Sequence, residues 1–206
     1  YVALGLFQSE EEILESPSQF GVPLYPGDIK YMDVNGDGVI DTNDRYPIGF
    51  TDVPEMFYSF KFGFNYKRFD FSCLFQGAAN VTYNFQTSTN IPFNNERSTP
   101  IVQWLDRWTP ENTNASMPGA TQYKNNEASS FWVRNASFLR CKNISISYDL
   151  PKTFVQRIGI DKARLFLNGT NLFLLQDKVK WMDPEATSIS DYPVMRNFSF
   201  GLNITI

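Results

Sequence analysis

The sequence predicts an all-β fold, an antiparallel transmembrane β-barrel with long loops on one side, and three observations support this prediction. Segments with alternating polar and apolar residues are as long as the strands of about 9–11 residues that cross a bilayer. Aromatic side chains gather at the ends of these segments as well as in the middle, as the aromatic girdles of such barrels require. Short and long connections alternate along the chain, which is the loop pattern of outer-membrane barrels.

The first two predicted strands form a hairpin. Even positions from Met56 to Tyr66 carry methionine or aromatic side chains, and odd positions from Ser59 onward are polar or glycine. A tight turn at Lys67-Arg68 shifts the apolar phase to odd positions, which continue to Phe75. This period of two gives each strand one apolar and one polar face.

Three further strands are predicted. The first covers 144–150, a less regular one lies near Arg164 to Phe173, and the last alternates Phe, Leu and Ile with polar residues or glycine over 197–206. All three have the same division into an apolar and a polar face, so the whole set is consistent with one sheet.

The lengths of the connections sort by side. The turn at 67–68 and the connection 151–162 are short, whereas 7–54, 86–132 and 174–194 are long. Counted back from the last strand, every long connection falls on the same side of the sheet, as expected for outer loops.

Composition excludes several function classes. The chain of 206 residues has no histidine, which excludes His-based triads, His general bases and His-ligated zinc. A net charge of -4 does not indicate nucleic-acid binding, and no run of eighteen apolar residues predicts a membrane helix. Cys73 and Cys141 fall in the apolar and the polar phase of their strands, so a disulfide between them is not expected.

Residues 33–44 have the spacing of a calcium loop of the EF-hand type. Gly38 permits the sharp turn, and the oxygen ligands would come from Asp33, Asn35, Asp37, Val39 (through its carbonyl), Asp41 and Asp44. The last position is aspartate and not the bidentate glutamate of calcium sensors, so we expect a structural site of modest affinity within the loop 28–50. The alternative is an acidic turn whose side chains hydrogen-bond only within the loop.

A short helix is predicted from Thr99 to Trp108, with Thr99 as its cap and Pro100 at its first position. Trp104 and Trp108 would then share one helix face. They would form either a stacking platform for a sugar ring or another ligand, or packing that holds the loop onto a barrel rim.

An ordered set of segments resembles the C-terminal part of SusC/RagA-family TonB-dependent transporters of the Bacteroidetes outer membrane. The segments span nearly the whole chain and are residues 27–31, 33–38, 44–45, 48–49, 66–72, 76–77, 108–112, 137–140, 142–144, 171–173, 183–185, 192–193 and 200–203. The set in this order is far more specific than any one of its members.

The resemblance implies a transporter, not an enzyme. The family is a barrel of about twenty-two strands around a plug, covered by a SusD-like surface lipoprotein and energised by the TonB complex, and it imports oligosaccharides or peptides through the bacterial outer membrane. Residues 1–206 would be one segment of that barrel domain, namely C-terminal strands of a large antiparallel transmembrane β-barrel with long extracellular loops. The plug and the TonB-contacting segment would be absent.

Physical chemistry also predicts a larger assembly. Five strands with apolar outer faces cannot close a barrel, and open strand edges in lipid leave backbone groups unsatisfied. The remainder of the barrel and the plug are therefore expected partners, together with membrane lipid. The polar residues expected to face the lumen or the plug are Lys61, Asn65, Asp70, Gln76, Ser145, Ser147, Asn197 and Asn203.

Two other classes are alternatives. A soluble, calcium-stabilised β-sandwich that binds carbohydrate through Trp104 and Trp108 would explain the metal loop, but not the sorting of the connections by length. A glycoside hydrolase fragment would need a pair of carboxylates at a defined separation. Asp106, Glu111, Asp183 and Glu185 are candidates, but each is more simply interpreted as a solvated loop charge.

Overall fold

The computed structural model describes residues 1–86, 100–120, 127–186 and 191–206. The chain forms two compact units, which are described separately. The first contains Tyr1–Asp52 and Thr82–Arg134, and the second contains Val53–Val81 and Asn135–Ile206. The loop 33–44 belongs to the first unit and the long predicted strands belong to the second.

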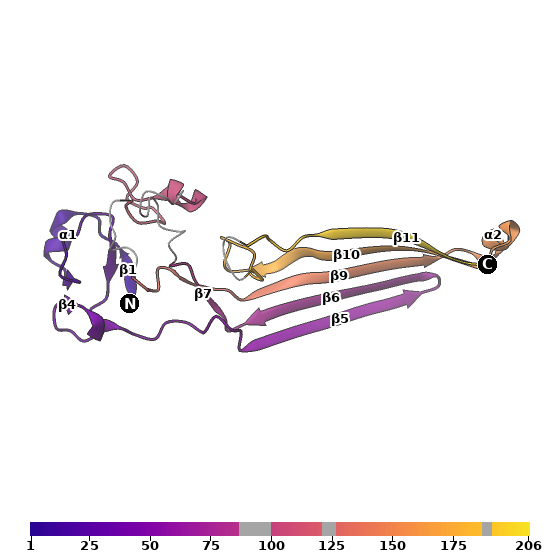
Figure 1. Ribbon diagram of the computed structural model, residues 1–206, viewed down its shortest axis with the longest axis horizontal. Helices are drawn as coiled ribbons and strands as arrows, with labels where there is room; N and C mark the ends of the chain where they lie inside the picture. Colours follow the sequence, from indigo (N-terminus) through magenta and orange to yellow (C-terminus); the bar gives the residue numbers. More distant parts are fainter. Residues whose placement is uncertain (87–99, 121–126, 187–190) are drawn as a thin grey trace. The chain divides into compact units, whose positions relative to one another are not determined.

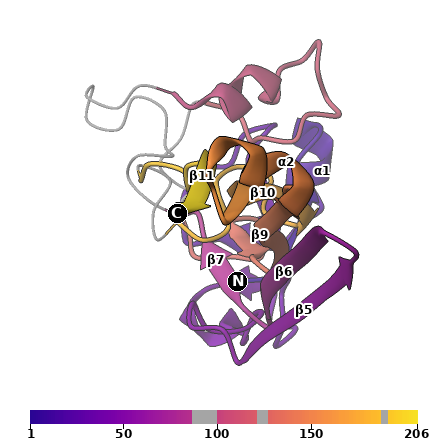
Figure 2. The same cartoon turned by 90° about the vertical axis from the view of Figure 1, so that its right-hand side faces the viewer.

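The second unit is built on a five-stranded antiparallel sheet with the order β11-β10-β9-β6-β5 (Figure 1). Its strands are β5 (Met56–Tyr66), β6 (Phe69–Ala79), β9 (Phe138–Asp149), β10 (Lys162–Asp177) and β11 (Asn197–Thr205). In the view turned by 90°, these strands follow one another in a single row (Figure 2). All five predicted strands are confirmed, and β9 and β10 extend beyond their predicted limits.

The register gives the sheet a mainly apolar and a mainly polar face, with Leu74 and Phe166 as apolar exceptions on the polar face. One row across all five strands contains the apolar residues Phe64, Phe71, Ile146, Leu167 and Phe200. The adjacent row on the opposite face contains Gly63, Ser72, Ser145, Asn168 and Ser199. The apolar face is uncovered in the described residues, since the side chains along β5 and β11 are about half exposed or more. Such a large apolar surface requires an apolar environment.

An aromatic ladder joins β5 to β6 on this apolar face. The rings of Phe60 and Phe75 stack with centroids 4.8 Å apart, and those of Phe64 and Phe71 stack at 5.3 Å. Cross-strand aromatic pairs of this kind stabilise a sheet by roughly 0.2–1 kcal/mol each. The ladder therefore holds the hairpin together even without a second layer of side chains above it.

The predicted sorting of connections by length is confirmed. At one end of the sheet, Lys67 turns the β5–β6 hairpin with a φ of 56°, and α2 (Lys152–Val155) with η5 (Gln156–Ile158) joins β9 to β10. At the opposite end, β6 leaves for the first unit, β9 returns from it, and the long β10–β11 connection begins (Figure 1). All long segments therefore leave from the same end.

The predicted phase was right for Cys73 and wrong for Cys141. The Sγ atoms of Cys73 and Cys141 lie 3.6 Å apart, and both thiols are free and buried. The pairing of β6 with β9 shifts register between Leu74 and Phe75, so Cys141 lies opposite Phe75 and on the same face as Cys73. A strand irregularity changes the phase of every later residue, and alternation in the sequence does not reveal where it occurs.

The first unit consists of short sheets around a small core. β1 (Ala3–Leu6) pairs with β3 (Ile29–Tyr31), and β7 (Thr82–Asn84) pairs with β8 (Val133–Asn135). β2 (Ser18–Gln19) pairs in parallel with β4 (Val39–Ile40), which lies within the acidic loop. α1 (Glu10–Leu14) is a single short helix capped by Ser9. The fully buried side chains of this core include Phe7, Ile29, Ile40, Phe85 and Trp132.

A buried glutamine links these short sheets. The Gln19 side chain donates to the Ile29 carbonyl at 3.0 Å and accepts from the Tyr31 N–H at 2.7 Å. Because an amide with both groups paired can be buried at little cost, Gln19 on β2 fixes β3 and thereby one side of the acidic loop. Among the described residues, no helix is long and apolar enough to span a bilayer.

Two strand glycines make different demands on space. A Cβ added to Gly77 would lie 2.3 Å from the backbone oxygen of Phe138, whereas one added to Gly201 would lie 2.2 Å from the ring of Phe166. We expect Gly77→Ala to lower the free energy of unfolding by about 1–3 kcal/mol, since β6 and β9 must separate. Gly201→Ala should cost less, because the end of a ring can swing away. Urea unfolding in detergent measures the free energy of unfolding of both variants. Equal losses would contradict the inference that Gly77 faces fixed backbone and Gly201 a movable side chain.

Candidate functional site

Carboxylates organise the loop 33–44 from within. Asp33 accepts hydrogen bonds from the Gly36 N–H at 2.7 Å and the Gly38 N–H at 2.8 Å. Both glycines have a positive φ, 77° and 83°, which L side chains rarely adopt. The two glycines therefore let the backbone curl around the first aspartate, as a cation-binding loop of this type requires.

The next two polar residues continue the same pattern. Asn35 accepts from the Asp37 N–H at 3.0 Å, and Asp37 accepts from the Val39 N–H at 2.9 Å. The Asn35 amide also donates to Asp37 at 2.9 Å. The side chains of Asp33, Asn35 and Asp37 therefore accept hydrogen bonds from backbone N–H groups of the same loop. Their oxygens are held close together in one short segment.

Asp44 closes the loop and is completely buried. Its carboxylate accepts from the N–H groups of Asp41 and Val34 at 2.8 Å and from that of Asn35 at 3.4 Å. These bonds, that from Asp41 foremost, lower the pKa of Asp44 below its ordinary value of 3.8. The carboxylate is therefore ionised at neutral pH in a position that spans the beginning and the end of the loop.

The oxygen ligands that this loop can supply are of the kind that a hard cation prefers. Asp33, Asn35, Asp37, Asp41 and Asp44 supply side-chain oxygens at alternating positions, and each ionised carboxylate has about four lone-pair sites, of which the loop amides use only some. Within the described residues, no three acidic or Cys side chains already converge on one point. Calcium coordination would therefore need the side-chain oxygens to turn toward the centre of the loop.

The predicted helix around the tryptophans is not formed as expected. Thr99 lies outside the described residues, and the observed element is a 3-10 helix, η3 (Val102–Asp106), that ends before Trp108. The Trp108 N–H instead donates to the Met117 carbonyl at 2.9 Å, because the chain becomes extended at Arg107. Trp104 and Trp108 therefore do not share a helix face.

The two tryptophans have separate surroundings. Trp108 packs against Gly27, where an added Cβ would lie 2.6 Å from the ring, and its Nε1 donates to the Gln8 side chain at 3.2 Å. Trp104 is 5% exposed and lies beside an apolar hollow of about 490 Å³. These contacts are those of side chains that hold a loop together. A role for either tryptophan in substrate binding remains a prediction.

The polar residues predicted for the sheet do share one face. The register places Lys61, Asn65, Asp70, Gln76, Ser145, Ser147, Asn197 and Asn203 opposite the aromatic ladder. On this face Arg164 binds Asp149 through two nitrogens at 2.6 and 2.8 Å and reaches Asp70 at 3.4 Å. Arg164 is thus paired with acidic residues of the neighbouring strands on this face, in contrast to the uncharged aromatic ladder.

A buried charge cluster at the long-loop end was missed from the sequence. Arg140 contacts Asp183 at 2.5 Å and Glu185 at 2.6 Å, and Lys142 contacts Glu185 at 2.6 Å. Asp183 also accepts from the Val194 N–H at 3.2 Å. Interpreting Asp183 and Glu185 as solvated charges was therefore wrong. Nothing in their spacing shows that β9 places two cations beneath them.

Together, these features define the class of protein. A single antiparallel layer with an uncovered aromatic face, a polar face with paired charges, and long connections at one end has the architecture of part of a membrane β-barrel wall. A closed sandwich would instead bury the aromatic face against a second sheet.

Comparison with known proteins identifies the family. The chain is 32% identical to the TonB-dependent receptor P26 of Formosa agariphila over 98% of its length, and 30% identical to the TonB-dependent receptor SusC of Bacteroides thetaiotaomicron over 84%. It covers 22% and 17% of those two proteins. No family model matches the chain. The chain belongs to the SusC/RagA family of TonB-dependent transporters.

The fold comparison agrees. The RagAB peptide importer in its open-open state matches the whole chain with a TM-score of 0.68 at 20% identity, over 22% of the matched chain. The closed-closed state matches 98% with a TM-score of 0.64. The strands therefore have the fold of part of such a barrel wall, and the chain spans about a fifth of the length of the relatives that it matches.

The buried charge cluster predicts a large effect of one substitution. Arg140→Met would leave Asp183 and Glu185 buried beside only Lys142, so we expect the free energy of unfolding to fall by about 3–5 kcal/mol and trypsin to cleave more readily after Lys178 and Lys180. Arg164→Met is the matched control, because the Arg164 side chain is 36% exposed and such pairs contribute about 1 kcal/mol or less. Equal losses in the two variants would show that burial of the cluster does not matter.

Proposed function

We propose that this chain forms part of the barrel wall and outer rim of a transporter that imports oligosaccharides or peptides together with a SusD-like lipoprotein. The observation that carries the proposal is the division of five long strands into one aromatic and one polar face, with every long connection at the same end. The aromatic face would contact lipid, and the polar face would contact the lumen or the plug.

The proposal assigns transport and not catalysis to the chain. Its relatives are named as receptors, and Asp106, a former candidate acid, is occupied by hydrogen bonds from Ser116 and Asn112 at 3.0 Å. The energy for uptake would come from the TonB complex through the remainder of the protein. The substrate would be recognised chiefly by loops, plug and lipoprotein.

The first test is the native mass of the particle purified from outer membranes in detergent. We expect a large complex that contains the remainder of the barrel and a lipoprotein, and that precipitates when detergent is removed. A monodisperse particle near 23.7 kDa in plain buffer would overturn the proposal and favour the calcium-stabilised sandwich.

The same proposal assigns a structural Ca²⁺ to the loop 33–44, held by Asp33, Asn35, Asp37, the Val39 carbonyl, Asp41 and Asp44. Four carboxylates within twelve residues repel each other, and a divalent cation would relieve this repulsion. Extracellular calcium modules bind at about 10⁻⁴–10⁻³ M. The ion would stiffen a loop on the outer rim, near where a lipoprotein lid would meet the barrel.

Removal of calcium should therefore act locally. In the full-length transporter we expect chelation to speed hydrogen exchange at the Gly36 and Gly38 amides while the strands remain protected. Asp33→Asn should weaken calcium binding about tenfold or more, whereas Asp52→Asn, an exposed control, should leave it unchanged. Equal affinity in the two variants, or unfolding of the strands on chelation, would contradict a calcium site that acts only on the loop.

A further inference from the structure

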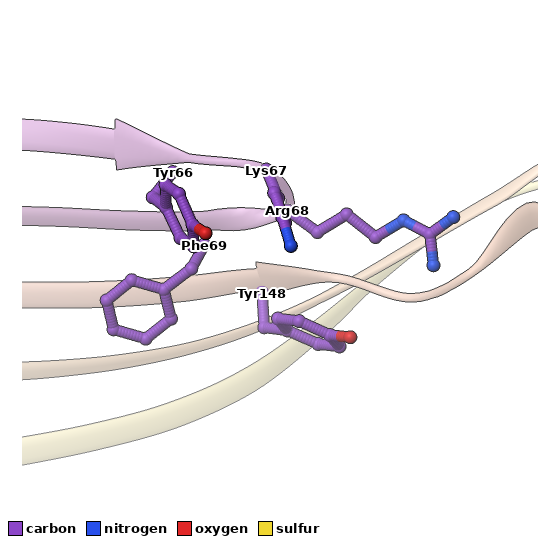
Figure 3. Close-up of a pocket in the computed structure, with 5 residues that line it drawn as sticks. All are labelled: Tyr66, Lys67, Arg68, Phe69 and Tyr148. Carbon is purple, nitrogen blue, oxygen red and sulfur yellow. The ribbon is translucent and has the colours of Figure 1, made fainter.

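The short-turn end of the sheet has a hollow on its apolar side. It has a volume of about 600 Å³ and is lined by Tyr66, Lys67, Arg68, Phe69 and Tyr148 (Figure 3). Tyr66 is paired with Phe69 across the hairpin, and Phe69 with Tyr148 on β9. The three aromatic residues therefore form one row across three strands, and the two cations come from the turn beside it.

The lining is rich in cationic donors and has no acidic residue. Among the described residues, neither Lys67 nor Arg68 forms an ion pair, since Asp149 and Asp70 are bound by Arg164. The Lys67 Nζ lies 5.2 Å from the centroid of the Tyr66 ring. Arg68 extends beyond the strand ends, the direction in which the Tyr148 hydroxyl also points (Figure 3). The donors thus remain available to an anion.

The backbone conformation at Lys67 is one that favours other residue types than lysine. A φ of 56° is left-handed, a conformation that glycine or asparagine adopts at lower cost than lysine. The turn geometry therefore does not explain a lysine at this position. A function of the Lys67 ammonium group, which lies over the Tyr66 ring, would explain why lysine is present.

The hollow continues into the aromatic ladder. The next row toward the centre of the sheet contains Phe64, Phe71 and Ile146, followed by Phe62 with Cys73, and then by Phe60 with Phe75. A ligand that fills this surface must therefore have an anionic end and a long apolar part. Tyrosines beside the cations fit the boundary between head groups and acyl chains, where amphipathic rings are favoured.

We propose that this hollow binds an anionic phospholipid of the membrane leaflet at the short-turn end. Its phosphate contacts Lys67 and Arg68, its glycerol region lies against Tyr66 and Tyr148, and an acyl chain follows the aromatic ladder. The proposal rests on the proposed membrane location of the sheet. A free phosphate ion would leave the three aromatic residues of the lining without a partner, so the lipid is the occupant that matches both parts.

The test uses the delipidated full-length transporter in detergent, titrated with phosphatidylglycerol and followed by native mass spectrometry. We expect the double variant Lys67→Gln, Arg68→Gln to bind the lipid roughly tenfold to thirtyfold more weakly, since each cation near a membrane surface contributes about 1 kcal/mol. Lys152→Gln, Arg157→Gln is the matched control, because it removes the same charge from the same end of the sheet outside the hollow. It should change the affinity by less than about twofold.

Other outcomes overturn the inference. Equal loss in the two double variants would show nonspecific attraction, and binding of inorganic phosphate as tight as that of the lipid would show a simple anion site. Uptake and outer-membrane location of the wild-type protein in cells distinguish a failure of the lipid site from a failure of the proposed transport function. If uptake and outer-membrane location hold but the hairpin variant binds lipid normally, the lipid site alone is refuted. If the wild-type protein is not in the membrane, the proposed function fails as well.

Discussion

Continuous hydrogen bonding between strands is the constraint on which the rest of this structure depends. In hydrocarbon, an unpaired backbone N–H or C=O costs several kcal/mol, so a sheet that contacts lipid on one face must pair every strand on both sides. Among the residues that the structure describes, β6, β9 and β10 meet this condition, whereas β5 and β11 are each paired on one side. The sheet is therefore complete only when other strands flank it, which agrees with a chain that spans about a fifth of its relatives.

Pairing across the sheet also explains the distribution of side chains. Because the register is unbroken from β5 to β6, the aromatic residues stack into a ladder, and charged groups such as Asp149 and Arg164 are confined to the other face. In the proposed membrane location, the cost of burying charge in lipid would thereby be avoided. At the short-turn end the apolar face meets the cations of the hairpin, and at the opposite end buried ion pairs anchor the β10–β11 connection to β9.

The loops follow a different principle from the sheet. The first unit has little regular structure, and its order comes from polar side chains that bind the backbone, as Gln19, Asp33 and Asp44 do. In the acidic loop, carboxylates replace secondary structure as acceptors for backbone N–H groups. This arrangement keeps oxygen ligands close together in a short segment, so the same residues that shape the loop are those proposed to bind calcium.

The sequence by itself determined the strands, their two faces, the side of the long connections and the glycine-rich form of the acidic loop, because each depends on residues close together in the chain. Only the tertiary structure decided the features that depend on register between distant segments. A shift beside Phe75 brought Cys73 and Cys141 together, extended backbone at Arg107 separated the roles of Trp104 and Trp108, and β9 placed Arg140 beneath Asp183. Alternation shows which face a residue occupies, but contacts between strands depend on irregularities and loop paths that leave no periodic signal.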